Sequence, residues 1–442
     1  MTSRNIVHSY LTISGTYTLS ASLIWGVNTL FLLDAGLDIF GVFVTNAVFT
    51  GSMALFEIPT GVLADTWGRR ASFLFSVAIV LVGTLGYVGV AAWQGGLWMF
   101  CLMSVILGLG YTFYSGAVEA WLVDALHATN FSGQLDQVFA RGAMVSGAAM
   151  LIGTVGGGLF ASLDMALPFV VRAALLAIVF CIAVFTMNDI GFTPRALQVT
   201  NLPKEMRIVA QTSIRHGWRE PSVRLLMIAS FIQAIFMAWG FYAWQPYFLD
   251  LLGKKEATWI AGIIAALISL STIVGNTIVE WFTRYCGRRT TLMLWAGGIS
   301  AIASAGVGIA TSFWLAVPLY LLVMVAMGVM MPVKQAYMHQ MIPSEQRATV
   351  ISFDSLIGSV GSAGGQAGLG YLSKVHSISL GYIVGGLVTV LVLPVQMVLR
   401  HLNNPVDVIV GTAGRKGGCS AQGIPEVASI NIHPFDGEED NT

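Results

Sequence analysis

Charged side chains are scarce in this 442-residue chain, where Asp, Glu, Lys and Arg together make up 10% of the residues. Ordinary soluble domains carry about 25% charged residues. Hydrophobic residues reach 56%, which is more apolar side chain than the interior of a soluble fold of this size can hold. The shortage of charge therefore excludes a soluble globular protein, and we expect lipid to solvate much of the surface.

Other absences narrow the function. The 4 cysteines form no C-x-x-C pair and the 7 histidines are dispersed along the chain, so we expect no metal site and no cofactor. No Gly-x-x-x-x-Gly-Lys-Ser/Thr loop is present to bind ATP. The 22 basic and 22 acidic residues cancel, and no basic patch indicates a nucleic-acid partner. No constellation of nucleophiles supports an enzyme.

Long apolar runs are abundant, and each has roughly the 20 residues that a helix needs to cross the hydrocarbon of a bilayer. Twelve such runs are predicted, at 11–33, 39–64, 71–93, 97–126, 137–162, 166–188, 222–251, 257–283, 290–311, 313–341, 348–373 and 378–401. The longest polar break follows the sixth run. The chain is therefore predicted to be an all-α integral membrane protein and a monomer, with two pseudo-symmetric six-helix bundles (1–188 and 222–401), a linker (189–221) and a disordered tail (402–442).

Lysine and arginine predict the orientation, because basic residues gather in cytoplasmic loops. With the N-terminus inside, 16 of the 22 basic residues fall on the cytoplasmic side, 3 fall outside and 3 lie within the runs. We therefore expect a multi-pass protein of the cell membrane with the linker and both termini in the cytoplasm.

A short basic turn occurs twice, half a chain length apart. The first copy is Gly61-x-Leu63-Ala64-Asp65-x-x-Gly68-Arg69-Arg70, and the second, degraded copy contains Gly287-Arg288-Arg289. A topology repeated in two halves is common in secondary transporters. The first copy resembles the signature of the major facilitator superfamily, and the chain looks most like its drug-efflux branch. The resemblance implies a transporter in which Asp65, Arg69 and Arg70 join a charge network that latches the cytoplasmic ends of the two halves.

Two positions depart from the exporters of that family. Such exporters often carry an arginine in the fourth helix where this chain has Ser104, and a proline in the fifth helix where it has Thr154. The main hypothesis is therefore proton-coupled export of a small, mostly apolar or amphipathic organic solute by alternating access. Import of a metabolite and a non-transporting membrane sensor on the same fold remain the alternatives.

Ionisable residues within membrane helices are costly and are functional candidates. Counted from the middle of each run, Glu57 lies about 8 Å and Glu119 about 11 Å toward the cytoplasm, and both are candidates for proton coupling. Lys334 and Asp354 lie about 10 Å toward the same side. A charge network that closes the cytoplasmic mouth is predicted to contain Asp65, Arg69, Arg70, Asp124, Arg141, Glu280, Arg288, Arg289 and Asp354.

Aromatic and methionine side chains suit a cavity for amphipathic solutes. The candidates for lining it are Trp25, Asn28, Tyr114, Trp239, Tyr242, Gln245, Met327 and Lys334. Arg172 is the one ionisable group placed on the outer side, about 7 Å from the middle of its run. Side and depth predict that Asp34, at the outer end of the first run, pairs with it.

Overall fold

The structure, a computed structural model, describes residues 2–114, 116–131, 133–191, 217–254, 256–283, 286–342 and 347–409. Most of the predicted linker and the predicted tail from residue 410 lie outside these residues. The described part is helical, and its one β-bridge joins Arg288 to Val408.

The N-terminal half holds the first six predicted spans, and two of these spans are interrupted. Its helices are α1 (Ser3–Ser22), α2 (Asn28–Asp34), α3 (Ile39–Trp67), α4 (Arg69–Ala92), α5 (Gly96–Tyr114), α6 (Ala117–Ala128), α7 (Leu135–Ala161) and α8 (Leu167–Thr186). The first span is divided into α1 and α2, and the fourth into α5 and α6.

The C-terminal half holds the other six spans. Its helices are α10 (Pro221–Leu252), α11 (Thr258–Thr283), α12 (Arg289–Ile309), α13 (Phe313–Met341), α14 (Arg347–Val375), α15 (Ile378–Val390) and α16 (Val392–His401), followed by the short 3-10 helix η4 (Pro405–Asp407). The twelfth span is divided into α15 and α16.

Local sequence accounts for several helix ends. The Asp38 carboxylate accepts a hydrogen bond of 2.7 Å from the Gly41 N–H and begins α3, and the Ser377 hydroxyl begins α15 in the same way. Pro221 stands in the first turn of α10, where its missing N–H leaves no bond unmade. Gly253, with φ +70°, ends that helix.

Ten helices among the described residues are long and apolar enough to cross a membrane. The two predicted spans that do not reach this standard are the first, which is broken between α1 and α2, and the eleventh, where α14 has many glycines and serines. Twelve crossings in two bundles still describe the chain, because each half repeats the same packing. Contacts of α1 with α7, α3 with α5 and α4 with α8 recur as α10 with α14, α11 with α13 and α12 with α15.

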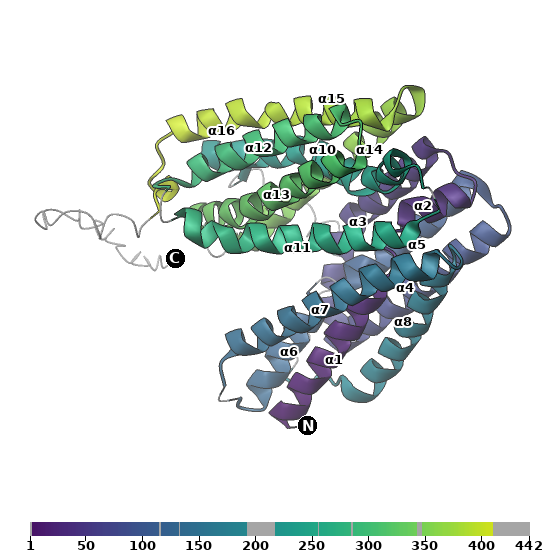
Figure 1. Cartoon of the computed structure of the whole chain (residues 1–442). Coiled ribbons are helices and arrows are strands. Elements are labelled where there is room, and N and C mark those ends of the chain that lie inside the picture. The colour runs from purple at the N-terminus through teal and green to yellow at the C-terminus, as the bar shows by residue number, and fades with distance from the viewer. Residues whose placement is uncertain are drawn as a thin grey trace, which may run out of the picture.

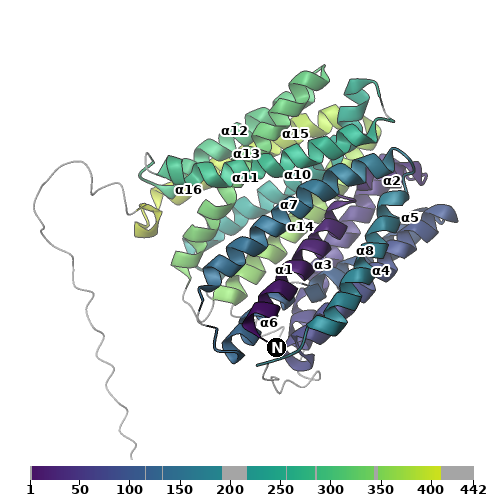
Figure 2. The ribbon, with the colours of Figure 1, turned by 60° about the horizontal axis from the view of Figure 1, so that its bottom comes forward.

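The two halves meet through α3 against α14, α7 against α11, and α2 against α10. Figure 1 shows them converging near α2 and diverging toward the end at which α1 begins and α16 ends, and Figure 2 shows α7 along their boundary. Backbones approach closely where α7 crosses α11, since a Cβ at Gly158 would lie 2.7 Å from the Gly262 Cα. Small residues therefore allow the close contact between α7 and α11.

Contacts between the halves are concentrated at the α2 end. Lys374 of α14 lies 2.8 Å from the Asp38 carboxylate, and the rings of Phe43 and Trp239 stack with centroids 5.8 Å apart. Further along α3, Gln366 Nε2 lies 3.3 Å from the Thr50 hydroxyl. From Thr50 to its end at Trp67, α3 continues for 17 residues, or about 26 Å, while the halves diverge. The molecule is thus closed at one end.

Candidate functional site

The break between α1 and α2 is held by a side chain from the other half of the chain. Gln245 of α10 is fully buried. Its Oε1 accepts a hydrogen bond of 2.9 Å from the Thr29 N–H, and its Nε2 donates one of 2.9 Å to the Trp25 carbonyl. The Thr29 hydroxyl donates to the Tyr242 carbonyl at 3.1 Å. Backbone groups freed by a broken membrane helix need hydrogen-bond partners, and the Gln245 side chain is the partner of two such groups.

A cavity of about 220 Å³ lies beside this break. The N-terminal half contributes most of its wall and α10 contributes Phe241 and Tyr242. The full lining is Ile24, Trp25, Asn28, Asn46, Phe49, Met53, Tyr87, Leu107, Tyr111, Arg172, Phe241 and Tyr242. Mostly apolar walls with a few polar groups are typical of sites for small organic molecules.

The polar groups of the cavity form two clusters. Asn28 Nδ2 donates to Asn46 Oδ1 at 3.3 Å, and Asn46 Nδ2 itself is buried without a hydrogen-bond partner. Arg172 of α8 is 2% exposed and donates through one terminal nitrogen to the Tyr111 hydroxyl at 3.0 Å. Its Nε is buried and has no partner.

The predicted pairing of Arg172 with Asp34 is wrong. Arg172 has Tyr111 as its partner, with the guanidinium carbon 5.9 Å from the centre of that ring. Asp34 is exposed at the end of α2, beside a separate outer hollow of about 590 Å³. Within the described residues, no carboxylate lies within 4.0 Å of the Arg172 guanidinium nitrogens.

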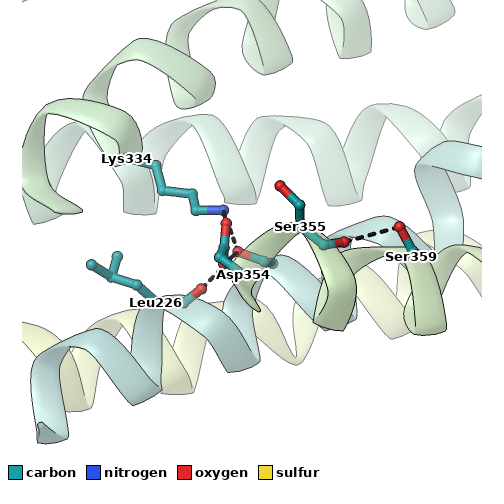
Figure 3. A network of polar contacts seen from close by, with 6 residues as sticks. Leu226, Lys334, Asp354, Ser355 and Ser359 are labelled. Atoms are coloured by element: carbon teal, nitrogen blue, oxygen red, sulfur yellow. Dashed lines mark hydrogen bonds and ion pairs between the residues drawn. The ribbon is translucent and has the colours of Figure 1, made fainter. Parts of the chain in front are cut away.

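Lys334 and Asp354, which the sequence assigned to different roles, form one ion pair in the C-terminal half (Figure 3). Lys334 Nζ of α13 lies 2.6 Å from Asp354 Oδ2 of α14, and both side chains are largely shielded, at 14% and 12% exposed. The Ser230 hydroxyl of α10 donates to Asp354 Oδ1 at 2.8 Å and also contacts Lys334. The pair and its serine partner therefore join α10, α13 and α14 at this point.

The proton-coupling candidates lie in the N-terminal half. Glu57 is exposed on α3 and Glu119 is exposed in the first turn of α6. A proton-exchanging group requires access to water in at least one state. Their coupling role stays a prediction.

The predicted gate residues make the following contacts with residues of their own half. Arg69 Nε is 4.0 Å from Asp124 Oδ2, and Arg70 donates to the Val184 carbonyl at 2.8 Å. The Arg70 N–H is capped at 2.8 Å by Asp189, which lies against Gly68 where a Cβ would clash. That contact and the φ of +103° account for the signature glycine.

The second copy of the turn is built in the same way. The Thr290 N–H donates to Asp407 Oδ1 at 2.8 Å, Arg289 donates to the Val406 carbonyl, and Arg288 donates to Asn403 at 3.1 Å. These contacts each stay within one half, and a gate between the halves stays a prediction. Arg141 is exposed on α7, and the side chains of Asp65 and Glu280 lie outside the part that the structure describes.

Of the eight cavity candidates, Trp25, Asn28 and Tyr242 line the cavity and five do not. Gln245 bonds the break beside it, Lys334 pairs with Asp354, and the other three lie elsewhere. Trp239 is fully buried against Phe43 and Tyr382, and Tyr114 stacks on Tyr17 with ring centroids 4.1 Å apart. Met327 is half-buried on α13 and is not part of the cavity wall. Sequence reasoning missed Asn46 as a site residue, although an asparagine in the middle of an apolar run is itself a signal of a polar site.

Comparisons with known proteins agree with this architecture. The sequence profile described as Major Facilitator Superfamily matches residues 11–285 and again 254–418. A curated relative, the uncharacterized MFS-type transporter YxaM of Bacillus subtilis (strain 168), is 22% identical over 397 residues, which cover 86% of this chain and 92% of YxaM.

Solved structures share the fold at low sequence identity. The crystal structure of the nucleoside transporter NupG aligns with a TM-score of 0.73 and 12% identity, over 90% of this chain and 99% of NupG. The POT family transporter PepTSo aligns with a TM-score of 0.68 and 12% identity, over 90% of this chain and 98% of that one.

Proposed function

Because the chain belongs to the Major Facilitator Superfamily, we propose that it is a secondary active transporter that carries a small amphipathic organic solute across the cell membrane by alternating access. The solute is exported in exchange for protons. The basic turns favour a cytoplasmic position for the open end of the molecule, and the proposal therefore treats the described conformation as inward-facing.

The observation that carries the proposal is the position of the cavity. It lies beside the broken first span, against α10 of the other half, and immediately next to the hydrogen bonds of Gln245 that join the halves. A solute in this cavity contacts both halves, so its binding energy differs between conformations in which the halves are together or apart. Alternating access requires that difference.

Proton coupling is proposed to use Glu57, with Glu119 as the second candidate. Both are exposed in this conformation, in the half of the chain that, among the residues the structure describes, has no Lys–Asp pair of its own within a span. The C-terminal half has its own buried ion pair, Lys334 with Asp354.

Proton-coupled import is the second candidate function. The position where exporters carry an arginine in the fourth helix holds Ser104, which is buried and bonded to the Tyr87 hydroxyl at 2.6 Å. A third possibility is a membrane sensor that binds the solute without moving it.

Purified protein in liposomes separates these functions. An outward solute flux driven by an inward proton gradient supports export, and accumulation with the protons supports import. Saturable binding without any flux would leave the sensor as the function.

A further inference from the structure

We infer that the cavity beside the broken first span is an anion-recognising site, in which Arg172 and Asn46 hold the carboxylate or similar acidic group of an aromatic or amphipathic organic acid. This inference rests on the proposed function and specifies the class of solute that the transporter would take.

The first observation is an arginine without a counter-charge. Arg172 is 2% exposed, and the described residues place no carboxylate within 4.0 Å of its guanidinium. Its contact with the Tyr111 hydroxyl is a bond to a neutral group. Burial of a permanent cation is costly unless an anion pairs with it, so the arrangement is that of a site prepared for an acid.

The second observation is that the unpaired polar groups are hydrogen-bond donors. Arg172 Nε and Asn46 Nδ2 are both buried hydrogen-bond donors without partners, and both residues line the cavity. Because the Tyr111 hydroxyl accepts from Arg172, its own proton is free to serve as a third donor. Three donors call for a ligand group that only accepts, and an ionised carboxylate is such a group.

The third observation is the remainder of the wall. The rings of Trp25, Phe49, Phe241 and Tyr242 surround the polar groups with apolar surface. A volume of about 220 Å³ equals that of about seven liquid waters, which suits one ring with a short chain. The acid is therefore small and carries an apolar body.

The neighbouring residues agree with this assignment. Tyr87, whose ring also lines the cavity, has its hydroxyl bonded to Ser104 and so adds no unpaired acceptor. Asn28 donates to Asn46 Oδ1, which turns the Asn46 amide so that its NH₂ group is the unpaired end. Asn28 is thus a positioning residue for Asn46.

The test uses matched probes on the purified full-length protein. Benzoate and phenylacetate are compared with benzamide and phenylacetamide, which keep the shape and lose the charge, and inorganic sulfate tests for an unspecific anion effect. Binding is measured as thermal stabilisation and by titration calorimetry. We expect the carboxylates to bind about tenfold to a hundredfold more tightly than the amides, the range that loss of a charge-assisted hydrogen bond produces.

Variants assign the effect to the site. Arg172→Gln should abolish the preference for carboxylates, Arg172→Lys should retain part of it, and Asn46→Leu should weaken carboxylates more than amides. Arg219→Gln, at an exposed arginine outside the spans, is the matched control and should bind as the wild type does. If Arg172→Gln does not fold, the comparison of carboxylate and amide on the wild type still decides.

Equal binding of each carboxylate and its amide, or stabilisation by sulfate alone, would overturn the inference. So would an unchanged preference in folded Arg172→Gln. Liposome flux of neutral solutes with no preference for acids would refute the anion site and leave the transporter standing. Tight carboxylate binding without flux would support the anion site and refute the transport function.

Discussion

Gln245 should be the latch that keeps the α2 end of the molecule closed, and Gln245→Leu should open it. The side chain is fully buried and makes two hydrogen bonds of 2.9 Å across the halves, to the Thr29 N–H and the Trp25 carbonyl. Leucine has a similar size and makes neither bond. Each buried group left without a partner costs about 1–3 kcal/mol, so the closed state should lose about 2–6 kcal/mol relative to a conformation in which water reaches the break.

Even the lower figure changes the ratio of closed to open molecules by about thirtyfold. The assay is the distance between spin labels on cysteines that replace Leu163 and Lys254, two exposed residues at this end in opposite halves. Gln245→Leu should lengthen it. Gln396→Leu is the matched control, because Gln396 is equally buried but bonds Met330 within its own half. A distance distribution for Gln245→Leu that coincides with that of the wild type would refute the latch.

Three further predictions concern coupling, pH and orientation. Glu57→Gln keeps size and hydrogen bonding but cannot titrate, so liposomes should show downhill exchange of solute and lose accumulation driven by a pH gradient; full accumulation would transfer the coupling role elsewhere. The Lys374 ammonium, with a backbone N–H, lowers the pKa of Asp38 below its ordinary 3.8, so their bridge is complete at neutral pH and is lost only as the external pH falls through that lowered value. Spin-label distances at the α2 end should therefore lengthen in strong acid, and Asp38→Asn should remove this pH response; persistence in the variant would assign it to another group. A cysteine at Gly95 should react with an impermeant thiol reagent added to cells and one at Gln198 should not, and the opposite pattern would invert the topology.

The spans could be predicted from the sequence because hydropathy and basic turns follow directly from the demands of the bilayer. The break between Ser22 and Asn28 could not, because it depends on Gln245, more than 200 residues away in the sequence. A local pattern reports that a residue is polar and gives no information about which distant backbone group it meets.

For the ionisable residues too, position could be predicted from the sequence and the contact partner could not. Arg172 was placed within a span, and the structure shows it buried there, but its predicted partner was wrong, since side and depth alone do not determine which helix packs beside it. For Lys334 and Asp354 the signal was present: both were placed at the same depth and carry opposite charges, yet they were assigned to separate roles. Matching of depth between opposite charges would have found this pair.

The most direct test of the account is solute flux in liposomes that contain only this protein and an imposed pH gradient. The panel holds aromatic carboxylates, their neutral amides, a nucleoside and a dipeptide. The account predicts saturable, gradient-driven movement of the aromatic carboxylates that stops when the pH gradient is collapsed. If the folded protein moves no member of the panel faster than protein-free liposomes do, the claim of secondary active transport of an amphipathic acid is contradicted.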